Sequence, residues 1–118
     1  MTKYQGKCHC GKVVFEVETD LAMVLECNCS HCSVKSLLLN FAPAERFHVL
    51  SGEADLTEYR FNKNVIQHLF CSHCDVEPFA RGQDPATGAP TVAINVRTLA
   101  DVDISELKPT PFDGRNLL

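Results

Sequence analysis

Three cysteines fall within six residues in the middle of the chain, and they are the strongest candidates for chemistry. They are Cys27, Cys29 and Cys32. On an extended segment the first two side chains point to the same face, and a tight turn after them would return the third sulfur to the same point. Three thiolates that converge in this way can hold a zinc ion with Zn–S bonds of about 2.3 Å and leave a fourth tetrahedral position open. An incomplete set of protein ligands is typical of a reactive zinc rather than a purely structural one.

The other four cysteines form two remote pairs, Cys8 with Cys10 and Cys71 with Cys74. Together the pairs complete a Cys₄ set, which is typical of a closed, structural zinc site that contributes folding free energy directly. Disulfides are disfavoured because the total of seven cysteines is odd and the spacings are CxC and CxxC. The sequence therefore predicts two zinc ions, one structural on four cysteines and a second on three.

A closed second site, with a histidine as the fourth ligand of the three cysteines, is the alternative. The side chains of His9, His31 and His73 each lie between two ligand cysteines, where we expect tight geometry to turn them outward. His48 and His68 could approach from strands, although an ordinary strand histidine, hydrogen-bonded or in solvent, is the simpler interpretation.

The composition limits the class of protein. The chain has 118 residues, a hydrophobic content of 45% and a net charge of −4, which suits one domain over residues 1–118. The chain has no run of Lys and Arg of the kind that binds nucleic acid. No apolar stretch approaches the roughly 20 residues of a membrane span. The start of the chain lacks the apolar region of a signal peptide, so we expect a cytoplasmic location.

The pattern of apolar residues predicts a mainly β domain of many short strands. The expected strands cover residues 12–18, 36–41, 47–50, 56–61, 65–70 and 91–99. A hairpin turn is expected at residues 62–64, one helical turn at 105–107 and an irregular tail at 112–116. The aromatic side chains expected in the core are Phe15, Phe41, Phe61, Phe70 and Phe79.

These motifs make the chain resemble the family of glutathione-dependent formaldehyde-activating enzymes and centromere protein V over nearly its whole length. The segments that carry the resemblance are Gly6-Lys7-Cys8-His9-Cys10-Gly11, Cys27-Asn28-Cys29-Ser30-His31-Cys32, Tyr59-Arg60-Phe61-Asn62, Phe70-Cys71-Ser72-His73-Cys74, Pro78-Phe79 and Asn95-Val96-Arg97. One departure is Asp75, where a glycine commonly follows the last CxxC in the family. Asp tolerates a positive φ better than most residues, at some cost.

The resemblance implies a β-tent fold of antiparallel sheets with zinc held between them. It also implies a carbon–sulfur lyase activity like that of S-(hydroxymethyl)glutathione synthase, with a small-molecule thiol and aldehyde as partners. By motif, the structural zinc belongs to Cys8, Cys10, Cys71 and Cys74. The catalytic zinc belongs to Cys27, Cys29 and Cys32.

The expected chemistry is the addition of a thiolate to formaldehyde or a related small aldehyde. Zinc binding lowers the pKa of a thiol, but three anionic sulfurs call for compensating positive charge, from Lys35 or from an arginine. The rival interpretation is a non-enzymatic zinc module for a protein or thiol-metabolite partner, because the β-tent fold also occurs in a small exchange factor for Rab proteins. Chromatin binding, by analogy with centromere protein V, is disfavoured by the acidic balance.

Overall fold

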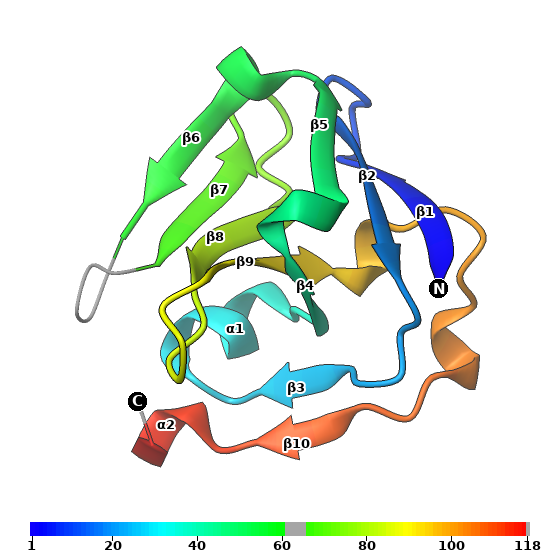
Figure 1. Cartoon of the computed structure of the whole chain (residues 1–118). Coiled ribbons are helices and arrows are strands. Elements are labelled where there is room, and N and C mark those ends of the chain that lie inside the picture. The colour runs from blue at the N-terminus through cyan, green and yellow to red at the C-terminus, as the bar shows by residue number, and fades with distance from the viewer. Residues whose placement is uncertain (61–65, 118) are drawn as a thin grey trace.

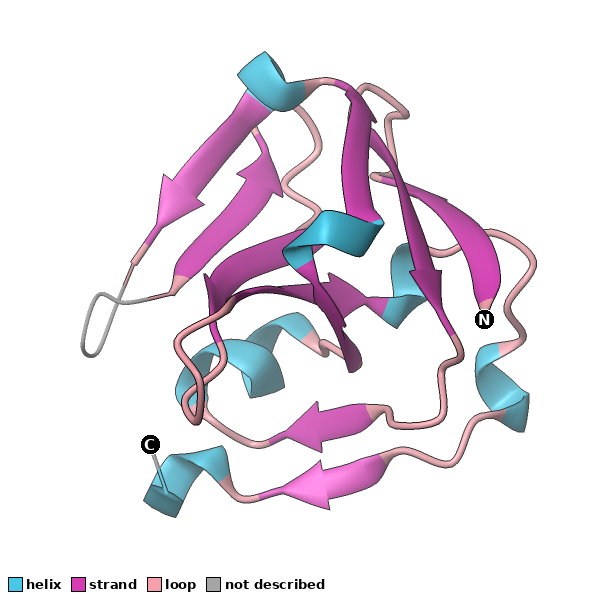
Figure 2. Cartoon of the chain, viewed as in Figure 1, coloured by secondary structure: helices cyan, strands magenta, loops and turns pink. Residues whose placement is uncertain are grey.

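The protein is a mainly β structure of two sheets, seen here in a computed structural model that describes residues 1–60 and 66–117. Figures 1 and 2 show the three-stranded sheet to the upper right, the strands β6 to β9 to the left and centre, and the pair β3 and β10 across the bottom. The predicted class, a mainly β fold, is confirmed. In the part of the chain that is described, no helix is long and apolar enough to cross a membrane.

The strands are short, and short helical turns lie between them. The strands are β1 (Thr2–Lys7), β2 (Val14–Thr19), β3 (Leu25–Cys27), β4 (Leu39–Pro43), β5 (Phe47–Ser51), β6 (Leu56–Tyr59), β7 (Gln67–Cys71), β8 (Phe79–Gln83), β9 (Pro90–Asn95) and β10 (Thr110–Phe112). The α-helices are α1 (Ser30–Lys35) and α2 (Gly114–Leu117). The 3₁₀ turns are η1 (Ala44–Arg46), η2 (Glu53–Asp55), η3 (Val96–Thr98) and η4 (Ile104–Glu106).

The two sheets differ in size and in strand direction. The smaller has the order β1-β2-β5 and is antiparallel throughout. The larger has the order β10-β3-β4-β9-β8-β7-β6 and is antiparallel except where β10 runs parallel to β3. Because β4 and β5 are consecutive in the chain but belong to different sheets, the short segment at η1 carries the chain from one sheet to the other.

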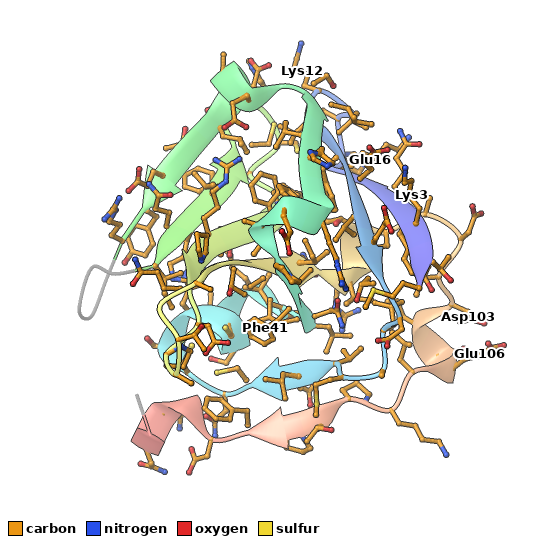
Figure 3. The ribbon with its side chains drawn as sticks, in the orientation of Figure 1. Lys3, Lys12, Glu16, Phe41, Asp103 and Glu106 are labelled. Atoms are coloured by element: carbon orange, nitrogen blue, oxygen red, sulfur yellow. The ribbon has the colours of Figure 1, made fainter. Side chains whose placement is uncertain are left out.

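The core lies between the sheets and is built by alternation along the strands. In β2 the side chains of Phe15 and Val17 are fully buried, whereas Glu16 between them is partly exposed; Figure 3 labels Glu16 beside Lys3 of β1. The ring of Phe15 lies 5.7 Å from the ring of Phe79, measured between centroids, in an edge-on arrangement. A period of two on a half-buried sheet produces this pattern, as the sequence predicted for residues 12–18.

Close packing against the Phe15 ring explains why Gly6 is a glycine. Gly6 pairs with Phe15 across β1 and β2, and a Cβ atom at Gly6 would lie 2.3 Å from Cζ of Phe15. The fully buried ring cannot move aside without disturbing the core. We expect Gly6→Ala to lower the free energy of unfolding by about 1–3 kcal/mol, the usual cost of an overpacked site. Urea denaturation measures this loss. Gly82→Ala is the control, because its Cβ would meet only ordinary contact at 3.6 Å, and an equal loss in both variants would contradict the explanation.

Most predicted strands are confirmed, but several boundaries were wrong. The strand predicted at 36–41 begins only at Leu39, and the strand predicted at 91–99 ends at Asn95. There the side chain of Asn95 accepts a hydrogen bond from the backbone N–H of Arg97 and starts a 3₁₀ turn, as Asn commonly does at a cap. The tail predicted to be irregular forms β10 and α2. The turn predicted at 62–64 lies outside the described residues.

The predicted aromatic core is also partly wrong. Phe15 and Phe79 are buried as expected, but Phe41, labelled near β4 in Figure 3, is 47% exposed. Phe70 is only partly buried, and Phe61 lies outside the described residues. The helical turn predicted at 105–107 is confirmed, one residue early, as η4.

Candidate metal centres

The four cysteines of the two remote pairs come together where the two sheets meet. Cys8 and Cys10 follow β1, and Cys71 ends β7 with Cys74 in the turn after it. The Sγ atom of Cys10 lies 3.6 Å from the Sγ atoms of both Cys8 and Cys71. A tetrahedral zinc with Zn–S bonds of about 2.3 Å places its sulfurs about 3.8 Å apart. The four-cysteine cluster therefore fits a zinc ion, and the predicted grouping of these residues is confirmed.

The backbone around this cluster is folded into two tight turns that aim N–H groups at sulfur. The N–H of Val13 donates to Sγ of Cys8, and the N–H of His73 donates to Sγ of Cys71, both at 3.4 Å. Each turn closes through a residue with positive φ, Gly11 at 82° and Asp75 at 66°. The positive φ anticipated from the sequence at Asp75 is present, and the N–H of Asp75 donates to the carbonyl oxygen of Cys71 at 2.9 Å.

The pKa values of two thiols in the cluster shift in opposite directions. A hydrogen bond from the backbone N–H of Lys12 would lower the pKa of Cys10, but desolvation and hydrogen bonds with the neighbouring thiols outweigh it and raise the pKa to about 11. Desolvation alone would raise the pKa of Cys74, but hydrogen bonds from the backbone N–H groups of Cys10 and Val76 outweigh it and lower the pKa to about 6. Thiolate is the form that binds metal. Disulfides are absent throughout, since all seven cysteines are free.

The other three cysteines form a second cluster at the start of α1. Cys27 ends β3, Cys29 is the N-cap of α1, and Cys32 lies buried in its first turn. The sequence predicted only a tight turn here; the turn continues into a six-residue helix. The thiol of Cys29 takes the place of the usual Ser or Asp cap, accepting from the N–H of Cys32 at 3.4 Å. The helix thus brings the third sulfur back to the first two, and this group could also hold a metal ion.

The three thiols differ in how readily each ionises. Burial raises the pKa of Cys27 and, more strongly, that of Cys32. At Cys29 burial is outweighed by hydrogen bonds that favour the thiolate, first among them that from the N–H of Cys32, so its pKa is lowered. Neighbouring thiolates in a buried group repel one another, and a divalent cation offsets that repulsion. The donor set therefore suits a zinc ion.

The histidines do not complete the three-cysteine cluster. Among the residues that the structure describes, no His, Asp or Glu joins Cys27, Cys29 and Cys32 in one ligand group. His48 is exposed on β5, and His73 is 46% exposed and hydrogen-bonded to Asp55, as the outward prediction required. The closed alternative, with a histidine as fourth ligand, has no support in the described part of the chain.

The prediction that His31 turns outward is wrong. Its side chain is only 8% exposed, and its Nε2 atom donates to Oε1 of Glu77 at 2.8 Å. His68 lies on the other side of the same carboxylate, with its Nδ1 atom 3.4 Å from Oε2. The sequence analysis did not identify Glu77, and it predicted no buried carboxylate that pairs with histidines. The signal was present: one acidic residue in the otherwise apolar run of residues 76–79, directly after a metal-binding turn.

Burial and the two histidines act on Glu77 in opposite directions. Burial would raise the pKa of the carboxyl group, but hydrogen bonds from His31 and His68 outweigh it and hold the pKa at about 2. Lys35, at the end of α1, adds a third contact, with Nζ 3.3 Å from Oε1. Lys35 was predicted as a counter-charge to the three thiolates. In the structure its ammonium group instead forms an ion pair with Glu77.

A cleft of about 510 Å³ opens onto Cys27 and Cys32 of the three-cysteine cluster. Its lining residues are Glu26, Cys27, Asn28, Cys32, Ser33, Ser36, Leu37, Arg97, Pro111, Phe112 and Asp113. Pro111 and Phe112 of β10 form part of the wall, and the backbone N–H of Asn28 donates to the carbonyl oxygen of Phe112 at 3.1 Å, which holds β10 in place. Arg97 is the cation among the lining residues. Its Nε atom donates to the carbonyl oxygen of Ser36 at 2.8 Å, which fixes the guanidinium at the cleft.

Comparisons with known proteins agree with this structure. A crystal structure of a Rhodobacter sphaeroides protein, a structural genomics target, is similar with a TM-score of 0.80 and 29% identity, over 91% of this chain and 97% of that chain. The sequence model of the glutathione-dependent formaldehyde-activating enzymes matches residues 3–111. That match spans both cysteine clusters and most of the cleft. The chain belongs to the family of glutathione-dependent formaldehyde-activating enzymes.

Proposed function

We propose that the protein is a zinc-dependent enzyme of the carbon–sulfur lyase type, which joins a thiol such as glutathione to formaldehyde or a related small aldehyde. The sulfur–carbon bond forms as the carbonyl π bond opens, and the thiol proton ends on the new hydroxyl group of an S-hydroxymethyl adduct. The observation that carries the proposal is a group of three cysteines, joined by no fourth ligand residue in the described chain, at the wall of a cleft.

The two clusters take different roles in this proposal. Cys8, Cys10, Cys71 and Cys74 hold a structural zinc. Cys27, Cys29 and Cys32 hold the catalytic one. When bound there, zinc supplies a fourth coordination position and lowers the pKa of a thiol. Family membership supports the chemistry, and a reducing cytoplasmic location suits seven free cysteines.

The cleft supports binding of an extended thiol beside the cysteines. Leu37 and Phe112 offer apolar contact for the carbon chain, and Ser33 offers a hydroxyl group. Arg97 lies on the same lining, and a guanidinium group binds a carboxylate through two parallel N–H donors. We infer that Arg97 binds a carboxylate of the thiol, because the charges of Glu26 and Asp113 elsewhere in the cleft repel one.

Replacing Arg97 tests this orientation. We expect Arg97→Met to raise the KM for glutathione about tenfold, the effect of losing one hydrogen bond to a charged group. The effect should be absent with 2-mercaptoethanol, a thiol without carboxylates. Steady-state kinetics with both thiols makes the comparison. Arg46→Met is the matched control, since Arg46 is exposed and absent from the cleft lining; an equal change of KM for both thiols would contradict the role.

Exchange spectroscopy by NMR tests the reaction itself. Glutathione and formaldehyde form their adduct spontaneously, so the readout must be the rate of exchange between free and adduct glutathione at equilibrium. The proposal predicts faster exchange with protein present and an unchanged ratio of adduct to free thiol. Exchange no faster than in buffer, with zinc shown to be bound, would reject the enzymatic function.

One observation favours the non-enzymatic alternative, a zinc module for a protein partner. The side chains of Phe41 and Ile66 are 47% and 44% exposed, and they line a shallow groove over the larger sheet together with Ala93. An apolar patch of this kind can mark an interaction site. The groove is separate from the cleft at the cysteines, since the two share no lining residue. If the protein does not accelerate adduct exchange, this groove becomes the candidate binding site for a protein partner.

A further inference from the structure

The buried carboxylate of Glu77 holds the helix that carries Cys32. Glu77 lies between β7 and β8 with its side chain only 2% exposed. Its Oε1 atom contacts both His31 at 2.8 Å and Lys35 at 3.3 Å. These two residues are four positions apart on α1 and therefore lie on one face of the helix. One carboxylate oxygen thus binds the first turn of α1 and its last turn together.

The ring of His31 is fixed by its neighbours as well. It stacks on Tyr59 with the planes 18° apart and packs against His68 with ring centroids 4.1 Å apart. His31 stands between Cys29 and Cys32 in the chain, and the backbone N–H of Cys32 donates to the thiol of Cys29 at 3.4 Å. A shift of this ring would therefore move the loop that presents the sulfurs.

Glu77 is in turn part of the frame of the four-cysteine cluster. It follows Cys74 by three residues, and the turn closes where the N–H of Cys71 donates to the carbonyl oxygen of Val76 at 2.9 Å. The side chain of Asn95 donates to the carbonyl oxygen of Glu77 at 3.0 Å. The carboxylate is consequently held by the backbone of one metal-binding turn while it binds the helix of the other.

We propose that Glu77 is a positioning residue which, through His31 and Lys35, fixes α1 and thereby sets Cys32 against Cys27 and Cys29. In this arrangement the four-cysteine turn and the three-cysteine loop form one frame. The inference rests on the proposed metal site at the three cysteines, but not on the reaction carried out there. Partners that hold metal ligands in place commonly change metal affinity by about 10- to 100-fold when they are replaced.

The same three side chains could instead hold a cation themselves. His31, His68 and Glu77 each offer a ligand atom within 4.8 Å of the others, and two histidines with a carboxylate form a known metal-binding set. Two observations favour the positioning role. Lys35 brings a positive charge to the same carboxylate oxygen, and the two imidazole rings pack against each other with centroids 4.1 Å apart.

Metal competition on the full chain tests the proposal. Zinc is titrated against a chromophoric chelator in wild type, Glu77→Gln and Lys35→Met, with total metal counted by mass spectrometry. We expect two zinc ions per wild-type chain, an affinity at the weaker site reduced about 10- to 100-fold in Glu77→Gln and less in Lys35→Met, and no change at the tighter site. Glu53→Gln is the control, because Glu53 forms an exposed ion pair with Arg81.

Hydrogen exchange supplies a readout independent of catalysis. The N–H groups of Ser33 and Leu37 bond to the carbonyl oxygens of Cys29 and Cys32, and they should exchange faster in Glu77→Gln. If that variant fails to fold, Lys35→Met decides, because the side chain of Lys35 is 31% exposed and its replacement leaves the buried charge of Glu77 with a partner on α1, His31. Unchanged zinc affinity and unchanged exchange would overturn the proposal, and so would a third metal ion that is lost in Glu77→Gln. If Glu77→Gln weakens zinc binding and speeds amide exchange as expected, but the wild-type protein does not accelerate adduct exchange, only the enzymatic function is rejected.

Discussion

Replacing Cys71 with alanine is expected to abolish cooperative folding. Cys71 is fully buried, and its sulfur joins a cluster that ties the end of β1 to the end of β7. Structural zinc sites contribute apparent binding free energies of about 10–16 kcal/mol, whereas a whole domain is stable by only about 5–15 kcal/mol. The free energy lost with this site should therefore exceed the free energy of unfolding of the whole domain. Calorimetry of Cys71→Ala should show no cooperative unfolding transition, and its NMR spectrum should lose dispersion.

The control for this prediction lies one residue away. Ser72 is exposed between the two ligands Cys71 and Cys74, and its hydroxyl group bonds only at the surface, to Thr57. Ser72→Ala should unfold within a few degrees of wild type. A Cys71→Ala protein that unfolds cooperatively at the wild-type temperature would show that the fold does not depend on this cluster.

Replacing Cys29 with serine is expected to remove the reaction and leave the fold. Cys29 has two roles, as a ligand and as the N-cap of α1. Serine keeps the cap but removes the thiolate, so the variant separates the two roles. We expect zinc content to fall from two ions to one per chain and adduct exchange to fall to the background rate, while the melting temperature stays within a few degrees. Metal analysis, exchange NMR and calorimetry measure the three outcomes.

Two further variants sharpen the comparison. Cys29→Ala loses the cap as well and should be less stable than Cys29→Ser by about 1 kcal/mol. Ser30→Ala, at the next and exposed position, should keep both zinc ions and the full rate. Wild-type exchange rates in Cys29→Ser would mean that the three-cysteine cluster is not the place of reaction.

The grouping of the cysteines was predictable from sequence because chelating spacing is a local property. In CxC and CxxC pairs the two cysteines are only two or three residues apart, so local backbone geometry brings their sulfurs together, and four plus three is the division that leaves no thiol over. The strands around them were predictable for a related reason: in β2 alternation of burial follows directly from the pleat. The structure confirms both.

The network around Glu77 was not predictable, because it depends on long-range contacts. Glu77 meets residues 46 and 42 positions away along the chain, His31 and Lys35. The outward prediction for His31 assumed an isolated tight turn between the ligand cysteines. In the structure the ligands begin a helix, and its first turn directs the imidazole toward the larger sheet. The end of β9 at Asn95 was missed similarly, since the apolar alternation of residues 91–99 continues past a capping side chain.

The strand β10 was missed for a different reason. Pro109 and Pro111 were expected only to stop the helical turn at residues 105–107, and the tail after them was predicted to be irregular. Pro111 nevertheless lies in β10, at the edge of the larger sheet, where a missing N–H is tolerated. The consequence is functional, because this edge strand supplies one wall of the cleft at the cysteines.

Cobalt substitution followed by a glutathione titration tests the central claim most directly. Cobalt in the two clusters reports through sulfur-to-metal charge-transfer and d–d bands. The proposal predicts a saturable change of these bands as glutathione is added, and no such change in Cys29→Ser, whose remaining spectrum should be that of the four-cysteine centre alone. A wild-type spectrum of two tetrahedral centres that glutathione leaves unchanged would contradict an open three-cysteine site and, with it, the proposed reaction.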